Sequence, residues 1–226
     1  MFRFIITLPK AVRQPKWRHY LPRSDTLPQS GVPMSKDQIL LDPARTALVM
    51  IDLQNGILAQ PLHPRSGDAV LENARNLIAK FRSANAPIVL VRVYWSSYMA
   101  DAPQQMVDLP SVPQKCPPED WGTLADGLQQ PDDILITKHQ WGAFYGTDLD
   151  LQLRRRGIDT IILGGVVTNF GVESTARCAW EHGYNVVIAE DTTATKSAEM
   201  HQFSITEILP RIALIRQSTE LTFATQ

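Results

Sequence analysis

Asp52 and Lys138 are the two residues of this 226-residue chain whose type and position most favour chemistry. Each lies at the end of an apolar stretch, Thr46–Leu53 for the first and Asp133–Lys138 for the second. A carboxylate in that position is expected to be buried, and a buried carboxylate needs a cation or several hydrogen-bond donors. Lys138 is a candidate partner if the two strands are neighbours, about 4.8 Å apart. The alternative for Asp52 is a structural ion pair or a cap for the adjacent loop.

A third polar stretch, Gly164–Gly171 (GGVVTNFG), leads from an apolar run into a helical pattern. It matches neither the dinucleotide-binding fingerprint G-x-G-x-x-G nor the lysine-bearing phosphate loop, so it does not indicate a nucleotide site. The start of the following helix, at residues 169–172, nevertheless has free backbone N–H groups. Such groups can hold an anion or the oxyanion that develops during a reaction.

The elements that position these residues alternate along the chain. Near-continuous apolar runs predict buried parallel strands, and apolar residues at helical spacing predict helices between them. This order predicts a three-layer α/β/α doubly wound sheet of six parallel strands, which are too few for a (β/α)₈ barrel. Ligands bind such sheets beyond the C-terminal ends of the strands, where all three polar stretches fall. The predicted strands are 46–53, 87–95, 133–138, 160–166, 185–189 and 213–217, and the predicted helices are 67–85, 147–156, 169–182 and 197–209.

Charge and composition exclude several classes of protein. Residues 1–23 carry six basic side chains and no acidic one, which leaves 16 basic and 23 acidic side chains in the rest of the chain. A basic nucleic-acid-binding face on the main domain is therefore not expected. No run approaches the ~18 apolar residues of a membrane span. The two cysteines, Cys116 and Cys178, fit neither a disulfide framework nor a zinc motif, and a cytoplasmic location is expected.

Two segments interrupt the regular pattern. Residues 1–38 are predicted to form a basic, proline-containing N-terminal extension, and residues 39–226 a single domain. The connection 96–130 contains five prolines and is too long for an ordinary loop, so it is either a lid over the site or an arm that grips a neighbouring subunit. A short helix is predicted within it, around residues 121–128.

Three motifs, in the right order, resemble the isochorismatase-like hydrolases, which include isochorismatases, nicotinamidases and N-carbamoyl amidohydrolases. The matching residues are TALVMIDLQNGIL (46–58), the continuous stretch 136–191, which contains WGAFYGTDL and GVESTAR, and the helix and strand between the two; the resemblance covers about residues 40–220. It implies a catalytic Asp at Asp52 and a catalytic Lys at Lys138. The nucleophilic Cys of the family pattern G-V-x-T-N-x-C-V falls on Gly171, so the chain resembles a subgroup with Gly at the Cys position.

Glycine cannot form the acyl-enzyme that a thiolate forms with a carbonyl. Cys178 is no substitute, because seven helical residues place it about 10.5 Å from Gly171. The resemblance therefore implies a reaction like that of the isochorismatases, acid-catalysed hydrolysis of a vinyl ether with Asp52 as the acid and Lys138 orienting it. Two alternatives stay open: a non-catalytic binder of small molecules, and an amidase-type hydrolase of an unidentified substrate.

Seven residues near the predicted edge are candidates for contact with a small-molecule substrate. Their aromatic members suit a planar ligand, although ordinary core packing explains each one equally well. The resemblance implies a non-proline cis peptide at Val166–Val167 and a homo-oligomer, a dimer or tetramer. Neither a metal nor a cofactor is expected, since Val93–Asp101 lacks the closely spaced histidines of metal-binding members, and no nucleic-acid or membrane partner is expected. The candidates are Gln54, Tyr94, Trp95, Trp141, Phe144, Val167 and Phe170.

Overall fold

The structure, a computed structural model, describes residues 38–113 and 115–223. Residues 1–37 of the predicted N-terminal extension lie outside the described residues. Among the helices described, none has the length and apolar character needed to cross a bilayer.

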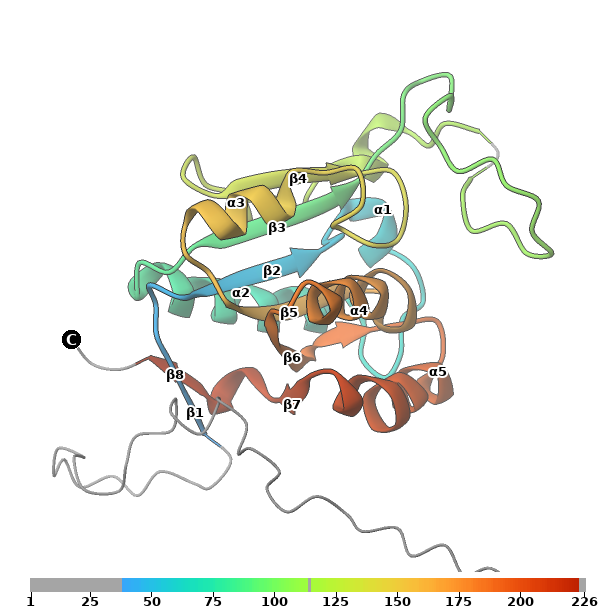
Figure 1. The fold of residues 1–226 in the computed structure, drawn as a ribbon. Helices are drawn as coiled ribbons and strands as arrows, with labels where there is room; N and C mark the ends of the chain where they lie inside the picture. Colours follow the sequence, from blue (N-terminus) through green and yellow to red (C-terminus); the bar gives the residue numbers. More distant parts are fainter. Residues whose placement is uncertain (1–37, 114, 224–226) are drawn as a thin grey trace, which may run out of the picture. The chain divides into compact units, whose positions relative to one another are not determined.

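A six-stranded parallel sheet with the order β4-β3-β2-β5-β6-β7 forms the centre of the fold (Figure 1). Every pairing in it is parallel, which confirms the predicted α/β class. All six residues of β2 are buried, as expected for a strand that is covered on both faces. The strands are β2 (Thr46–Ile51), β3 (Ile88–Val93), β4 (Ile134–Lys138), β5 (Thr160–Val166), β6 (Asn185–Ala194) and β7 (Leu214–Arg216).

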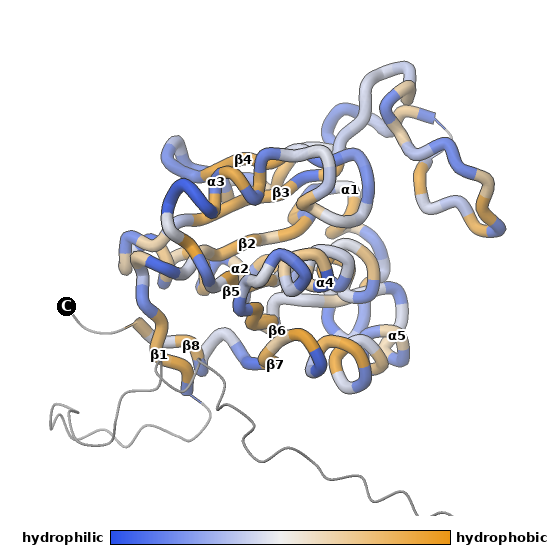
Figure 2. The backbone as a smooth tube through the Cα atoms, viewed as in Figure 1, coloured by the Kyte–Doolittle hydropathy of each residue, from blue (hydrophilic) through white to orange (hydrophobic). Residues whose placement is uncertain are grey.

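Helices cover both faces of the sheet because successive side chains of a strand point to opposite sides. Leu48 and Met50 of β2 belong to the core beneath α2 (Gly67–Ser83). Val49 and Ile51 belong to the core beneath α3 (Leu149–Arg155) and α4 (Glu173–Glu181). Figure 2 shows the central strands as largely hydrophobic, in contrast to the mixed colouring of the helices around them. The remaining helices, α1 (Asn55–Leu58) and α5 (Ala198–Phe203), are short.

The strands that lead to Asp52 and Lys138 are not neighbours, so the condition on which Lys138 was named as a candidate partner does not hold, although the two residues do pair. Strand β3 lies between them, with Val91 beside Ile51 and Val93 beside Lys138. All three strands run parallel and end at the same edge of the sheet (Figure 1). A lysine side chain is long enough to reach across the end of β3, and this reach brings the two charged groups together.

Four of the predicted elements differ clearly in type or extent, and the four-residue helix α1 was not predicted. Strand β6 continues to Ala194, five residues beyond the predicted end, because threonines are compatible with a strand as well as a loop. The predicted helix at 121–128 is a 3₁₀ helix over Glu119–Gly122 followed by turns. The predicted helix at 169–182 begins with a π-helical turn, Thr168–Val172, ahead of α4. The predicted helix at 197–209 is divided: α5 ends at Phe203, and a π-helical turn and a 3₁₀ helix follow it.

A small parallel sheet was also not predicted. It pairs β1 (Ile39–Leu41) with β8 (Leu221–Phe223), near the two ends of the described chain. Strands of three residues are too short to show a periodic pattern in sequence. Lys80 of α2 donates to the carbonyl oxygens of Ser218 and Leu221, which ties this sheet to the domain.

The long connection after β3 has two distinct parts. Pro103 and Ser111–Pro113 line the cavity described below, as expected of a lid. Between them the chain extends from the domain as a green loop in Figure 1, and it exposes Met106 and Leu109 almost completely. Exposed apolar side chains of this kind are also expected of an arm that contacts another subunit.

Candidate active site

A cavity of about 530 Å³ lies at the C-terminal edge of the sheet, where the sequence places the site. Its lining comes from the ends of five strands, β2 to β6, and from the long connection. Seven of the ten predicted site residues line it, which brings together segments more than 100 residues apart in sequence. These seven are Asp52, Lys138, Gly171, Trp95, Trp141, Val167 and Phe170.

Asp52 and Lys138 form a buried ion pair in the wall of this cavity. Lys138 Nζ lies 2.7 Å from Asp52 Oδ2 and donates a second hydrogen bond, of 3.0 Å, to the carbonyl oxygen of Gln140. The side chains are only 1% and 7% exposed, respectively. Asp52 Oδ1 is buried and forms no hydrogen bond, so the negative charge on this oxygen is poorly compensated and a proton would stabilise it.

The backbone at Asp52 adopts a conformation that few side chains tolerate. Its φ of 51° lies in the left-handed region, where aspartate is among the better tolerated residues. Gly165 of β5 pairs with Ile51, the residue before Asp52; it has a φ of 105°, and a Cβ there would lie 2.0 Å from the Ile51 carbonyl oxygen. Only glycine allows β5 to approach β2 so closely at the point where Asp52 leaves the strand.

Burial raises the pKa of Asp52 above its ordinary value, and the charge and hydrogen bond of Lys138 offset this effect only in part. The sequence leaves open which of these opposing effects prevails. A raised pKa favours a protonated Asp52, which is the state required of a general acid.

Gly171 faces this ion pair from the π-helical turn. A Cβ built on Gly171 would lie 3.5 Å from Asp52 Oδ2 and 3.6 Å from the Trp141 carbonyl oxygen. The same Cβ would lie 3.0 Å from Ile51 Cγ2, so a side chain at position 171 requires a small shift of Ile51 and begins next to the carboxylate. The peptide bond Val166–Val167, which precedes the turn, is cis, as the family resemblance implies.

Aromatic rings form the walls of the cavity. Trp141 stacks on Phe170, with ring centroids 4.5 Å apart and planes 13° from parallel. Trp95 donates its indole N–H to the His139 carbonyl oxygen and stacks on Trp121 at 6.0 Å. Flat, fixed walls of this kind favour a flat ligand.

Three predicted contact residues do not line the cavity, and each has another role. Tyr94 packs against Gly122 and is 39% exposed. Phe144 is buried in the core on the α3 and α4 side, stacked on His182. Gln54 is fully buried and bonds only to backbone groups: its amide donates to the carbonyl oxygens of Val93 and Gly122, and its Oε1 accepts from the Val93 N–H.

Replacing Gln54 with Leu should lower the free energy of unfolding by about 3 kcal/mol, because buried backbone groups at Val93 and Gly122 lose their partners. Urea denaturation of the variant measures this difference. Gln202→Leu is the matched control, since Gln202 is exposed on α5. A Gln54→Leu protein of unchanged stability but weaker substrate binding would show instead that Gln54 contacts the ligand.

Lys196 and Trp121 line the cavity although the sequence does not point to them. With β6 predicted to end at Ala189, Lys196 lies far beyond the strand. With β6 extending to Ala194, Lys196 follows a strand end directly, as the other site residues do. Trp121 is in the long connection, whose path cannot be derived from periodicity.

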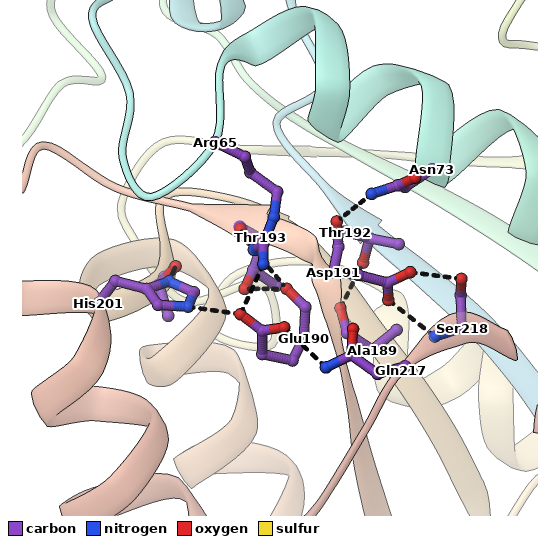
Figure 3. Close-up of polar contacts among 11 residues, drawn as sticks. Arg65, Asn73, Ala189, Glu190, Asp191, Thr192, Thr193, His201, Gln217 and Ser218 are labelled. Carbon is purple, nitrogen blue, oxygen red and sulfur yellow. Dashed lines mark hydrogen bonds and ion pairs between the residues drawn. The ribbon is translucent and has the colours of Figure 1, made fainter. Parts of the chain in front are cut away.

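A buried polar cluster supports the turn that carries Gly171 (Figure 3). His201 Nδ1 lies 2.9 Å from Thr168 Oγ1 of the turn. His201 Nε2 lies 2.8 Å from Glu190 Oε1, a contact drawn in Figure 3. Burial acts to raise the pKa of Glu190, but hydrogen bonds from His201, Gln217 and Arg65, together with the Arg65 charge, lower it to about 2. The cluster therefore holds α5, β6 and the turn together through an ionised carboxylate.

The described residues contain no group of three or more His, Cys, Asp or Glu side chains that could hold a metal ion. Cys178, on α4, does not line the cavity. Burial and the charges of Glu181 and Asp150 raise the pKa of its thiol, which opposes formation of a thiolate. Among the described residues that line the cavity, Asp52 and Lys138 form an ion pair.

Comparison with known proteins gives matches to one family over most of the chain. The sequence model of the Isochorismatase domain matches residues 46–220. The chain is 56% identical over 182 residues to the isochorismatase family protein YecD of Escherichia coli O157:H7, a match that covers 80% of this chain and 96% of YecD. It is 42% identical to an isochorismatase family protein of Burkholderia thailandensis, with a TM-score of 0.78 over 81% of this chain and 96% of that one. It is also 28% identical over 201 residues to the ureidoacrylate amidohydrolase RutB of Methylobacterium radiotolerans, over 78% of each chain.

Proposed function

The chain belongs to the isochorismatase family of hydrolases, and from this premise we propose that it hydrolyses a small molecule by acid catalysis at Asp52, without a cysteine nucleophile. One observation carries the proposal. The carboxyl group of Asp52 is buried in the cavity wall, its pKa is raised, and its Oδ1 has no partner. A buried carboxyl group that binds its proton more tightly than usual, next to an ammonium group, is suited to proton transfer.

The reaction that best fits these groups is hydrolysis of a vinyl ether. Asp52 gives its proton to the terminal enol carbon, and the electrons of the double bond form the new C–H bond. The oxocarbenium ion that results adds water, and its hemiacetal or hemiketal collapses to an alcohol and a carbonyl compound. The proton released in these steps returns to Asp52. Lys138 stabilises the carboxylate in the interval between the two transfers.

The position of Gly171 supports a reaction without covalent catalysis. A Cβ at this position would lie 3.5 Å from Asp52 Oδ2, and the family pattern has its cysteine there, but glycine supplies no nucleophile. Release of pyruvate from isochorismate by the purified protein, measured with a coupled assay, tests the proposed reaction. An absence of pyruvate would reject isochorismate as a substrate, and release that iodoacetamide abolishes would reject the mechanism.

Gly171→Cys should introduce amidase or esterase chemistry. The new thiol would lie beside Asp52 and the start of a helix, so a burst of product equal to the enzyme concentration is expected with an activated ester. Stopped-flow absorbance measures the burst. Gly171→Ser is the matched control, since a hydroxyl is a weaker nucleophile in the same place. Lack of a burst from a folded, alkylatable Gly171→Cys protein would mean that the acyl-transfer geometry is absent.

Two alternatives, an amidase and a non-catalytic binder, predict different results. Similarity to a ureidoacrylate amidohydrolase favours an amidase, which would be recognised by release of an amine or of ammonia. A non-catalytic binder would show stabilisation by a ligand without turnover.

A homo-oligomer is part of the proposal, since the exposed apolar loop around Met106 and Leu109 suits a contact between copies. Light scattering during size-exclusion chromatography measures this assembly.

A further inference from the structure

Lys196 is a cation at the solvent side of the cavity. It is exposed, whereas Asp52 and Lys138 are buried, and all three line the same cavity. Its Nζ lies 5.7 Å from the centroid of the Phe170 ring, which is one half of the stacked wall. The ammonium group thus lies beside the flat wall, next to the residue that precedes Gly171 in the turn.

The backbone beneath Lys196 is held in place from several sides. Thr195 and His63 exchange two backbone hydrogen bonds of 2.6 and 2.7 Å, and the Thr195 hydroxyl donates to Asn169 Oδ1 at 2.5 Å. Arg65 donates to the carbonyl oxygens of Glu190 and Thr193, near the end of the same strand (Figure 3). The ammonium group therefore extends from a fixed base, as a ligand-binding side chain must to be specific.

The charges around the cavity leave Lys196 without a counter-ion. Asp52 is the only carboxylate among the described lining residues, and it is paired with Lys138. No carboxylate in the described part of the chain forms an ion pair with Lys196, whose recorded contact is the Phe170 ring. With His139 neutral, the lining has a formal charge of +1, which favours an anionic ligand.

We propose that Lys196 binds the carboxylate of the substrate and makes the enzyme specific for small, flat, carboxylate-bearing molecules. This inference rests on the proposed function and names its substrate class. The flat part of the molecule packs against Trp141 and Phe170, its carboxylate meets Lys196, and its hydrolysable bond faces Asp52.

Benzoate and benzamide test this assignment, because they have nearly the same shape and differ in charge. Three tryptophans line the cavity, so quenching of intrinsic fluorescence reports binding. The wild-type protein should bind benzoate about tenfold more tightly than benzamide, as expected for a hydrogen bond between charged groups. Lys196→Gln should remove this preference, and Lys196→Glu should reverse it. Lys115→Gln, which changes an exposed lysine outside the cavity lining, is the matched control and should keep the preference.

Equal binding of the two probes by the wild-type protein would overturn the role of Lys196, as would a preference that survives Lys196→Gln. Binding of neither probe would overturn the substrate class. Benzoate has no bond that this chemistry hydrolyses, so the titration is independent of turnover. A failure of acid catalysis would appear instead in the Asp52 variant described below, with the benzoate preference intact.

Discussion

Asp52→Asn should lower the rate of hydrolysis by about 1,000-fold, because an amide of the same shape cannot deliver a proton. The rate of pyruvate release under saturating isochorismate is the measurement if that compound is the substrate. The effect should fall on kcat more than on KM, since a proton is transferred only in the transition state.

The controls for Asp52→Asn separate catalysis from folding. Asn also removes a buried charge, so the variant must show the wild-type circular dichroism spectrum and remain folded at the assay temperature. Asp132→Asn, at an exposed turn, is the matched control and should keep full activity. A folded Asp52→Asn protein with more than a tenth of the wild-type rate would rule out Asp52 as the acid.

The pH dependence of the rate follows from the same group. The acid must be protonated to act, so kcat/KM should fall as the pH rises through the pKa of Asp52 in the folded protein. Burial places this pKa above the ordinary value, which extends the active range toward neutral pH. A rate that rises over the same interval would indicate that the Asp52 carboxylate acts as a base.

Lys138→Met should destabilise the fold by about 3–5 kcal/mol, the usual cost of leaving one charge of a buried pair without its partner. Methionine keeps most of the apolar length of the lysine, so the loss reports chiefly on charge. The free energy of unfolding in urea is the measurement. The double variant Asp52→Asn/Lys138→Met should recover much of this loss, because it leaves no buried charge. A double variant as unstable as Lys138→Met would show that packing of the lysine stem, and not the ion pair, is what matters.

The deficit of Lys138→Met should also grow with pH. The pKa of Asp52 is raised in the folded state, so the folded protein binds this proton more tightly than the unfolded chain does. The resulting stability is complete below the unfolded pKa and is lost as the pH rises through the folded pKa. Lys138 lowers the pKa of Asp52 in the folded protein, so this pKa is higher in the Lys138→Met variant. The variant therefore keeps losing stability at pH values where the wild-type protein has stopped losing it. Unfolding measured at pH 5 and at pH 8 should therefore show the larger deficit at pH 8.

Much of the architecture was predictable because it depends on local pattern. The continuous apolar run 46–53 indicates a buried strand, and the apolar residues at helical spacing in 67–85 indicate a helix. Parallel strands joined by helices place their C-terminal ends at one edge, so Asp52, Lys138 and the turn around Gly171 were expected to meet there. The motifs in these segments also carry the family resemblance that implied the cis peptide at Val166–Val167.

Other features depend on how distant segments pack, which periodicity does not encode. Strand order places β3 between the two charged residues, and only the folded sheet shows that Lys138 reaches across it. The Gln54 side chain bonds to backbone groups and does not line the cavity. Its partners are the carbonyl oxygens of Val93 in β3 and of Gly122 in the long connection, which are far from Gln54 in sequence. The length of β6 placed Lys196 at the site. The raised pKa of Asp52 likewise arises from burial beneath several strands at once, because desolvation depends on everything that excludes water from the carboxyl group.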